Sequence, residues 1–227
     1  MNAGALVLFD IDGTLLRRAG PHHKDALIEA IRSVLRREAS LANIPTHGML
    51  DCDLLRLMVG ELELSEALAE DMLPELRRAA QDFYLANCPS DLRTCVCPGV
   101  VSLLDTLQER GIPVALVTGN LTGIGWKKIE LAGLRHYFAS GAFSEQAATR
   151  TALAQAAAEQ MKKLGLVDEK ARISLIGDHP NDIRAARANS MQAIATATGL
   201  SSVDELRQEK PDILVQDLSE LNIEQLL

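Results

Sequence analysis

Aromatic residues are scarce in this chain of 227 residues, where four Phe, two Tyr and one Trp make up 3% of the composition. Proteins that bind single-stranded nucleic acid stack its bases on aromatic side chains, and this chain has little material for such a surface. Basic residues are also a minority, because 23 Lys and Arg stand against 31 Asp and Glu and leave a net charge of −8. Clusters of basic side chains are what grip a phosphate backbone. The composition therefore predicts no nucleic-acid partner.

Long apolar runs and cysteines are few as well. No window approaches about 18 uninterrupted apolar residues, which excludes a membrane span. The apolar N-terminal stretch has no basic segment before it, unlike a signal peptide. The four cysteines lack the usual zinc spacings, so we expect reduced, partly buried thiols rather than a metal clip; they are Cys52, Cys88, Cys95 and Cys97. Together these absences favour a cytoplasmic protein in a reducing environment, with no membrane partner.

What is present is an ordinary globular balance of 47% hydrophobic and 24% charged residues. Short apolar runs rich in β-branched residues alternate with longer helical patterns. Such runs are typical of strands in a parallel sheet that helices cover on both faces; they are residues 5–9, 113–117, 172–176, 191–195 and 212–215. Helices are expected near residues 99–110, 121–132, 149–164, 180–189 and 202–208. The alternation predicts an α/β fold with a doubly wound parallel sheet.

The segment between the first two runs differs in character. Its helical patterns cover residues 23–39, 51–61 and 65–87, and no run in it is typical of a strand. An insertion of about seventy residues is too long for a simple crossover, so we expect an all-helical cap domain. The predicted joints are residues 16–20 and 89–98. The expected boundaries give a core of residues 1–18 and 93–227 and a cap of residues 19–92.

Carboxylates follow two of the predicted strands. Asp10 and Asp12 come at the end of the first, while Asp178 ends the strand over 172–176 and Asp182 follows on the first turn of a helix. The carboxyl ends of parallel strands meet at the crevice where open α/β sheets bind ligands. Carboxylates that converge there repel each other unless a cation lies between them. Helix capping would explain one such residue but not two sites, so we predict a divalent metal, Mg²⁺, in the crevice.

A third strand end carries Thr118, Gly119 and Asn120. A hydroxyl followed by glycine and the start of a helix offers a side-chain donor and free backbone N–H groups, which suit an anionic phosphate. The same triplet is also a good turn. Its position beside the two acidic strand ends favours phosphate binding.

These motifs resemble those of the haloacid dehalogenase superfamily with a helical cap of the first type, and most closely its phosphoglycolate phosphatase-like members. The resemblance rests on Asp10-Ile-Asp12-Gly-Thr14, Thr118-Gly-Asn120 and Gly177-Asp178-x-x-x-Asp182, in this order and with a helical insertion after the first. It covers essentially the whole core. It implies a Mg²⁺-dependent phosphohydrolase whose partner is a small phosphorylated metabolite.

The resemblance also implies roles for individual residues, and elementary chemistry agrees with them. Asp10 would be the nucleophile that forms an aspartyl-phosphate, and Asp12 would protonate the leaving oxygen and then activate water. Asp10 and Asp178, with the main-chain carbonyl of Asp12, would hold Mg²⁺. Thr118 would bind a phosphate oxygen, and Asp182 would orient the metal or its waters.

One family element departs from its usual form. A lysine normally precedes the last motif, but the chain has none between Phe143 and Lys162. Arg150 is our candidate for its catalytic and phosphate-binding role, because it keeps the charge and adds bidentate geometry. Lys127 and Lys128 are the alternatives, although a solvated helix face is the better interpretation of both.

In the predicted cap, His47-Gly48-Met-Leu-Asp51 resembles the turn through which helical caps of this family contact substrate. Gly48 and Asp51 are therefore candidate specificity residues; equally, Asp51 could cap an ordinary helix N-terminus. Trp126 is expected to pack its own helix. No catalytic role is assigned to the other histidines considered, which are His22, His23, His136 and His179.

Two rival functions stay open at this stage. A phosphosugar mutase keeps the same residues, and a non-catalytic phosphate-binding or regulatory protein could use the same fold. A dehalogenase is disfavoured, since dehalogenases of this family lack the aspartate found here as Asp12. The sequence leaves open which phosphate ester is bound and whether the protein is a monomer or a homodimer.

Overall fold

A computed structural model describes residues 3–226 of the chain. Within them a six-stranded, wholly parallel sheet has the order β3-β2-β1-β4-β5-β6. The strands are β1 (Ala3–Phe9), β2 (Val114–Val117), β3 (Phe138–Ala142), β4 (Val167–Gly177), β5 (Gln192–Thr196) and β6 (Ile213–Val215). The order reverses at β1, which lies between β2 and β4. The crevice for ligands is therefore expected beyond the carboxyl ends of these three strands.

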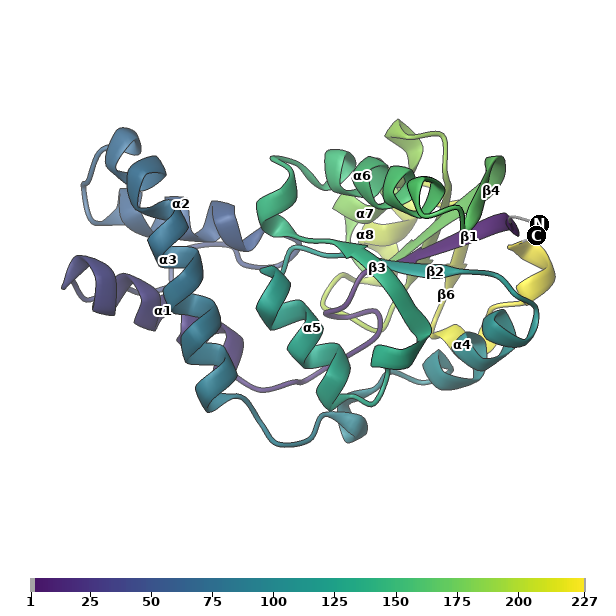
Figure 1. Ribbon diagram of the computed structural model, residues 1–227, viewed down its shortest axis with the longest axis horizontal. Coiled ribbons are helices and arrows are strands. Elements are labelled where there is room, and N and C mark those ends of the chain that lie inside the picture. Colours follow the sequence, from purple (N-terminus) through teal and green to yellow (C-terminus); the bar gives the residue numbers. More distant parts are fainter. Residues whose placement is uncertain (1–2, 227) are drawn as a thin grey trace.

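Helices cover both faces of the sheet (Figure 1). Side chains alternate along β1, so Val7 and Phe9 pack with α4 (Val100–Glu109) and α5 (Thr122–Leu131), whereas Leu6 and Leu8 pack on the other side. That side is covered by α6 (Arg150–Lys163), α7 (Pro180–Ala188) and α8 (Val203–Gln208). The two apolar faces explain why the strands lack polar alternation, and the predicted α/β doubly wound fold is confirmed.

The strand β3 was not expected. Its sequence, Phe138-Ala-Ser-Gly-Ala142, holds no β-branched residue, and only pairing with β2 at the edge of the sheet makes it a strand. Five short 3₁₀ helices complete the described elements, at Arg93–Cys95, Arg135–Tyr137, Ser144–Gln146, Leu218–Glu220 and Ile223–Gln225.

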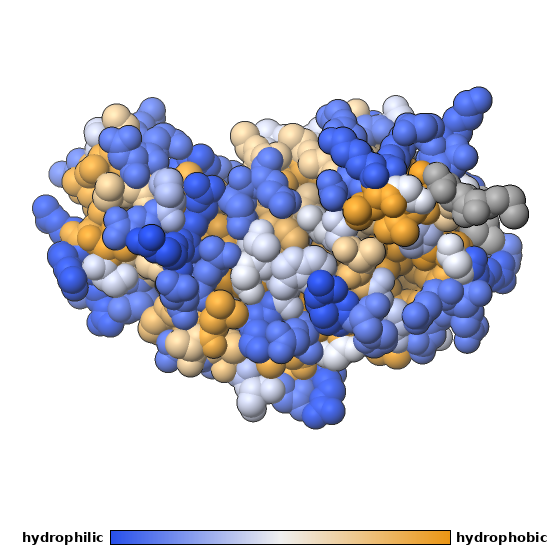
Figure 2. All heavy atoms as spheres, viewed as in Figure 1, coloured by the Kyte–Doolittle hydropathy of each residue, from blue (hydrophilic) through white to orange (hydrophobic). Residues whose placement is uncertain are grey.

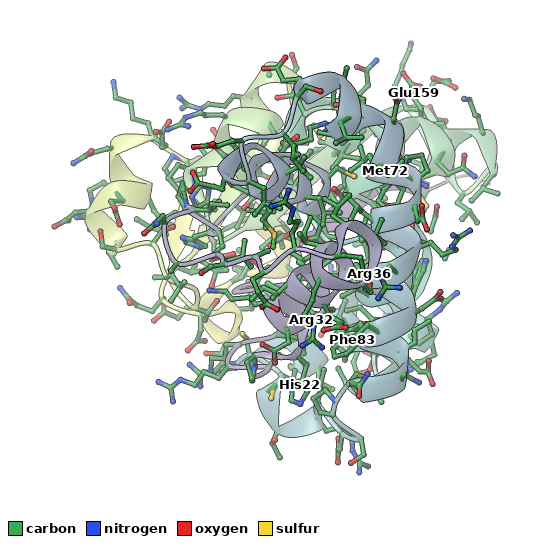
Figure 3. The ribbon with its side chains drawn as sticks, turned by 90° about the vertical axis from the view of Figure 1, so that its left-hand side faces the viewer. His22, Arg32, Arg36, Met72, Phe83 and Glu159 are labelled. Carbon is green, nitrogen blue, oxygen red and sulfur yellow. The ribbon has the colours of Figure 1, made fainter. Side chains whose placement is uncertain are left out.

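Three helices, α1 (His22–Leu35), α2 (Asp51–Glu61) and α3 (Glu66–Asn87), form a separate all-helical body beyond the carboxyl end of the sheet (Figure 1). In Figure 3, which faces this body, α1 and α3 lie along each other, with the labelled Arg32 on α1 and Phe83 on α3. Helix α1 was expected to continue to residue 39. It ends at Leu35 because Arg36 takes a left-handed conformation, with φ 56°, and its N–H bonds back to Arg32.

Two neighbouring segments connect this body to the sheet. Leu16 forms an antiparallel bridge with Val96, flanked by hydrogen bonds from Arg17 N to Cys95 O and from Cys97 N to Leu15 O, both 2.9 Å long. The predicted joints at residues 16–20 and 89–98 thus include two segments of the chain that lie side by side. The domain boundaries at residues 18/19 and 92/93 stay a prediction.

The surface view in Figure 2 shows a mostly hydrophilic face with scattered apolar patches and a notch between the helical body and the sheet domain. Every helix within residues 3–226 is too short or too polar to cross a membrane. The four cysteines are free thiols, as expected, with Cys52 and Cys97 buried. Trp126 packs against Phe143, with ring centroids 5.3 Å apart, which confirms its structural role.

Candidate active site

A cavity of about 220 Å³ lies between the carboxyl ends of the strands and the three-helix body. Its floor includes predicted site residues from the core, among them Asp10, Asp12, Thr118, Arg150 and Asp178. Its roof comes from α1, the start of α2, α3 and the loop before α2, and includes His23, His47, Gly48, Asp51 and Tyr84. Asp10 and Asp178, which lie 168 positions apart in the sequence, thus line the same cavity.

Three carboxylates converge at the carboxyl edge of the sheet, and two of them, Asp10 and Asp178, line the cavity. Asp10 follows β1, Asp178 follows β4, and Asp182 lies in the first turn of α7. One oxygen of each lies within 4.8 Å of the others, and all three side chains are buried. The residues are held in place locally, since Asp10 N donates to Ile176 O and Asp182 Oδ2 accepts from His179 N. Thr14 donates to Asp178 Oδ1 at 3.2 Å.

The electrostatics of this cluster suit a cation. Burial, and then the neighbouring carboxylates, raise the pKa of Asp10 above its usual range, and burial does the same for the pKa of Asp178 and of Asp182. Asp182 Oδ1 is buried and accepts no hydrogen bond within residues 3–226. Hard carboxylate oxygens in this arrangement could bind a metal ion such as Mg²⁺. Asp182 therefore belongs to the same acidic cluster as Asp10 and Asp178, the two carboxylates predicted to hold the ion.

Arg150 contacts two of the three carboxylates. It is the first residue of α6, whose N-terminus Thr149 caps by accepting from Ala152 N. Its Nη1 donates to Asp10 Oδ1 at 2.8 Å, and its Nε lies 3.3 Å from Asp182 Oδ1. A guanidinium here offsets part of the negative charge of the cluster. The structure thus places the candidate that replaces the expected lysine directly beside Asp10.

The turn after β2 is built by its own side chains. Thr118 is fully buried, and its Oγ1 accepts from Asn120 Nδ2 at 2.7 Å and from Asn120 N at 3.3 Å. The hydroxyl proton of Thr118 is therefore available for a ligand in the cavity. Gly119 cannot be replaced by a larger residue without a clash, because a Cβ there would lie 2.3 Å from Met49 O. It allows the loop before α2 to sit on the strand end, where Asp51 N donates to Gly119 O.

The expectation for Lys128 was wrong. Its side chain is 2% exposed rather than solvated, and its Nζ lies 2.7 and 2.8 Å from the two carboxylate oxygens of Asp12. Burial opposes the ionisation of Asp12, but the Lys128 ammonium, His23 and the hydrogen bonds from Lys128 and Asn120 together outweigh burial and lower the pKa of Asp12 below its usual value. Lys127, its neighbour, pairs with Glu130 at 3.0 Å and does not line the cavity. Sequence spacing alone could not show which of Lys127 and Lys128 faces the cavity, because the answer depends on how α5 is rotated about its axis.

The loop before α2 and the first residue of that helix contact the core. Asp51 does not cap its own helix: the N-cap is Leu50, and the Asp51 carboxylate accepts from Leu121 N at 2.8 Å, at the start of α5. Gly48, with φ +70°, approaches the His179 ring so closely that a Cβ would lie 2.2 Å from it. Both residues therefore fix the roof of the cavity to its floor.

Two histidines in the roof have contacts that the sequence did not suggest. His47 Nε2 lies 3.2 Å from Asp178 Oδ2, and the signal available for it was its place beside Gly48. His23 lies between Asp51 and Lys128, at 2.9 and 3.0 Å, and no spacing pattern in the sequence indicated these contacts.

His179 caps α7 by accepting from Asn181 N. Burial, and then the charge of His47, lower the pKa of His179 to about 4 and keep its ring neutral.

A search of family models matches residues 5–189 to the haloacid dehalogenase-like hydrolases. The match covers most of the chain and all three motifs, so the protein belongs to the haloacid dehalogenase-like hydrolase family. The resemblance drawn from the motifs is confirmed, as is the expected enzyme class of hydrolase. Among curated proteins, a phosphoglycolate phosphatase of Agrobacterium fabrum is 28% identical over 226 residues, covering 95% of this chain and 90% of the relative.

Solved structures share the fold at lower identity. A hydrolase from Pseudomonas syringae has a TM-score of 0.67 at 20% identity and covers 94% of both chains. A β-phosphoglucomutase from Clostridium difficile has a TM-score of 0.68 at 17% identity, covering 99% of this chain and 95% of that one. Both support the fold class, including the helical body inserted after β1.

Proposed function

We propose that the protein is a Mg²⁺-dependent phosphatase that hydrolyses a small phosphate monoester through an aspartyl-phosphate at Asp10. The observation that carries this proposal is the buried cluster of Asp10, Asp178 and Asp182 with Arg150 at 2.8 Å from Asp10. The cavity of about 220 Å³ suits a compact substrate. The similarity to a phosphoglycolate phosphatase supports a small phosphorylated acid as the substrate class.

In the proposed reaction, Thr118 and Arg150 bind phosphate oxygens and orient the phosphorus toward Asp10. An Asp10 oxygen forms a bond to phosphorus while the bond to the ester oxygen breaks, and Asp12 donates a proton to that oxygen. Asp12 must be protonated for this step, although Lys128 lowers its pKa. Asp12 then accepts a proton from the water that hydrolyses the aspartyl-phosphate. Mg²⁺, held by Asp10, Asp178 and the Asp12 carbonyl with Asp182 beside them, would neutralise the phosphate charge.

A panel of small phosphate monoesters tests the proposal, with phosphate release measured with and without Mg²⁺. We expect Mg²⁺-dependent release that Asp10→Asn abolishes. Asp71→Asn, on the exposed side of α3, is the matched control and should retain full activity. Activity of Asp10→Asn equal to the wild type would overturn the nucleophile assignment. Migration of phosphate within a sugar, without net release, would instead indicate a mutase.

A further inference from the structure

Lys128 has all three of its ammonium protons engaged. Its Nζ lies 2.7 and 2.8 Å from the Asp12 carboxylate oxygens, 2.7 Å from Asn120 Oδ1 and 3.0 Å from His23 Nδ1. Lysine offers three donors and no acceptor, so these three partners saturate it. A fully engaged, buried ammonium is not available to bind substrate. Its function must therefore act through the residues that it holds.

The proton count fixes the role of His23. Because Lys128 can only donate, His23 Nδ1 must accept, which leaves the imidazole proton on Nε2. His23 Nε2 then donates to Asp51 Oδ2 at 2.9 Å, and the same carboxylate oxygen accepts from Leu121 N at 2.8 Å. A continuous chain of hydrogen bonds thus runs from the roof of the cavity to Asp12.

Asp12 needs such support. Its side chain is 44% exposed toward the cavity, and its carboxylate is held by donors from the wall: Lys128 on both oxygens and Asn120 Nδ2 on Oδ2 at 2.7 Å. An acid–base group must lie within hydrogen-bond reach of the reacting oxygen in both half-reactions. Without its donors, the exposed carboxylate would be free to rotate.

We propose that Lys128 is a positioning residue for Asp12, and that His23 with Asp51 makes this positioning depend on the seating of α1 and α2 over the sheet. The inference rests on the proposed function, because it assigns Lys128 a purpose in the acid–base steps of that reaction. Two of the links, His23 and Asp51, come from the inserted helices, and two, Lys128 and Asn120, come from the core. The helical body thereby supplies one of the three partners that hold Lys128 against Asp12.

The leaving group distinguishes positioning from a merely structural role. An alkyl phosphate needs a proton on its departing oxygen, whereas nitrophenolate leaves without one. For Lys128→Met we expect kcat/KM for alkyl phosphates to fall by about 10²-fold, the typical contribution of general acid catalysis. For nitrophenyl phosphate kcat/KM should fall far less, while kcat falls because water attack on the aspartyl-phosphate still needs Asp12. A burst of nitrophenol equal to the enzyme concentration should therefore appear.

Lys127→Met is the matched control, since Lys127 is the adjacent lysine and lies outside the cavity; it should behave as the wild type. His23→Gln supplies an amide oxygen for Lys128 and an amide N–H for Asp51, so it should retain more alkyl-phosphate activity than His23→Leu. Both His23 variants should keep the buried Lys128–Asp12 pair, which provides a test if Lys128→Met fails to fold.

Equal losses for alkyl and aryl phosphates, with no burst in Lys128→Met, would overturn the positioning role, as would equal activity of His23→Leu and His23→Gln. This failure is distinct from failure of the proposed function. If the function itself is wrong, the wild type releases no phosphate from either ester. If only the inference is wrong, the wild type is active and Asp10→Asn is not, but the leaving-group dependence of Lys128→Met equals that of the wild type.

Discussion

Arg150 is a single residue on which two buried carboxylates depend. Its guanidinium lies against Asp10 at 2.8 Å and Asp182 at 3.3 Å, inside the cavity floor. A neutral side chain at this position would leave the carboxylates of the cluster without this counter-charge. In the proposed reaction the same charge serves both stability and catalysis, and the two effects can be measured separately.

Arg150→Met is expected to lower kcat/KM by about 10²- to 10³-fold, the typical cost of removing one donor that stabilises transition-state charge. It should also lower the free energy of unfolding by about 3 kcal/mol, because breaking a buried ion pair leaves uncompensated charge. Phosphate-release kinetics and urea unfolding check the two effects.

Arg150→Lys is the matched variant: it keeps the charge but not the fork that reaches both carboxylates. It should fall between the wild type and Arg150→Met in both measurements. Wild-type kinetics in Arg150→Met would contradict the phosphate-binding role, whatever its stability.

At the scale of elements, α2 depends on a residue of the core for its N-terminus. Ser144 Oγ, in the 3₁₀ helix Ser144–Gln146, accepts from Cys52 N at 2.8 Å. The N-cap of α2 itself, Leu50, makes no side-chain cap. The cap of α2 therefore comes from the core, and its loss should affect both the stability of α2 and the position of α2 on the core.

Ser144→Ala should cost about 1 kcal/mol of unfolding free energy, as N-cap removal typically does, and should raise KM several-fold because α2 loosens over the cavity. The control is Ser65→Ala, which removes the cap of α3, where Ser65 Oγ accepts from Leu68 N. It should lose similar stability with an unchanged KM. A KM that rises equally in both variants would argue against a special role of the α2 seat. Thermal unfolding and substrate titrations provide the comparison.

At the scale of the whole molecule, the acidic cluster should make stability depend on pH and metal together. Because the pKa values of Asp10, Asp178 and Asp182 are raised in the folded state, the metal-free folded protein binds more protons than the unfolded chain between about pH 4 and the folded pKa values. The contribution of these groups to stability is present below that pH and is lost as pH rises through their folded pKa values. Mg²⁺ binds the ionised carboxylates and should oppose this loss.

We expect Mg²⁺ at about 100 times its Kd to raise Tm by about 5–10 °C near pH 8. The increase should be smaller near pH 5, where protons compete for the same oxygens. Calorimetry of the metal-free protein with and without Mg²⁺ measures both values. Asp178→Asn should lose most of the effect. The same Tm increase at both pH values, or in Asp178→Asn, would place the bound ion elsewhere.

How much of this molecule could be predicted from sequence depends on how local each signal is. The β1 run and the carboxylates after it are local, so Asp10 and its strand were predictable, as were Asp178 and α7. Strand β3 was missed because its residues favour no strand by themselves and only β2 pairs with them.

The site shows the same division. The position of Arg150 followed from an expected charge near the last motif. The contact between Lys128 and Asp12 spans 116 residues and depends on the rotation of α5. His23 and Ser144 gain their contacts only when the helical body meets the sheet domain, and nothing in the nearby sequence carries that geometry.

The bridge between Leu16 and Val96 has a consequence for how such molecules change over time. Because the inserted helices leave and re-enter the core through two adjacent, hydrogen-bonded segments, the ends of the insertion are already joined in space. A different insertion, longer or shorter, needs only the same two attachment points. A new preference for the group attached to phosphorus could therefore arise by exchange of the inserted helices, while the residues at the sheet that we propose to perform the chemistry are inherited unchanged.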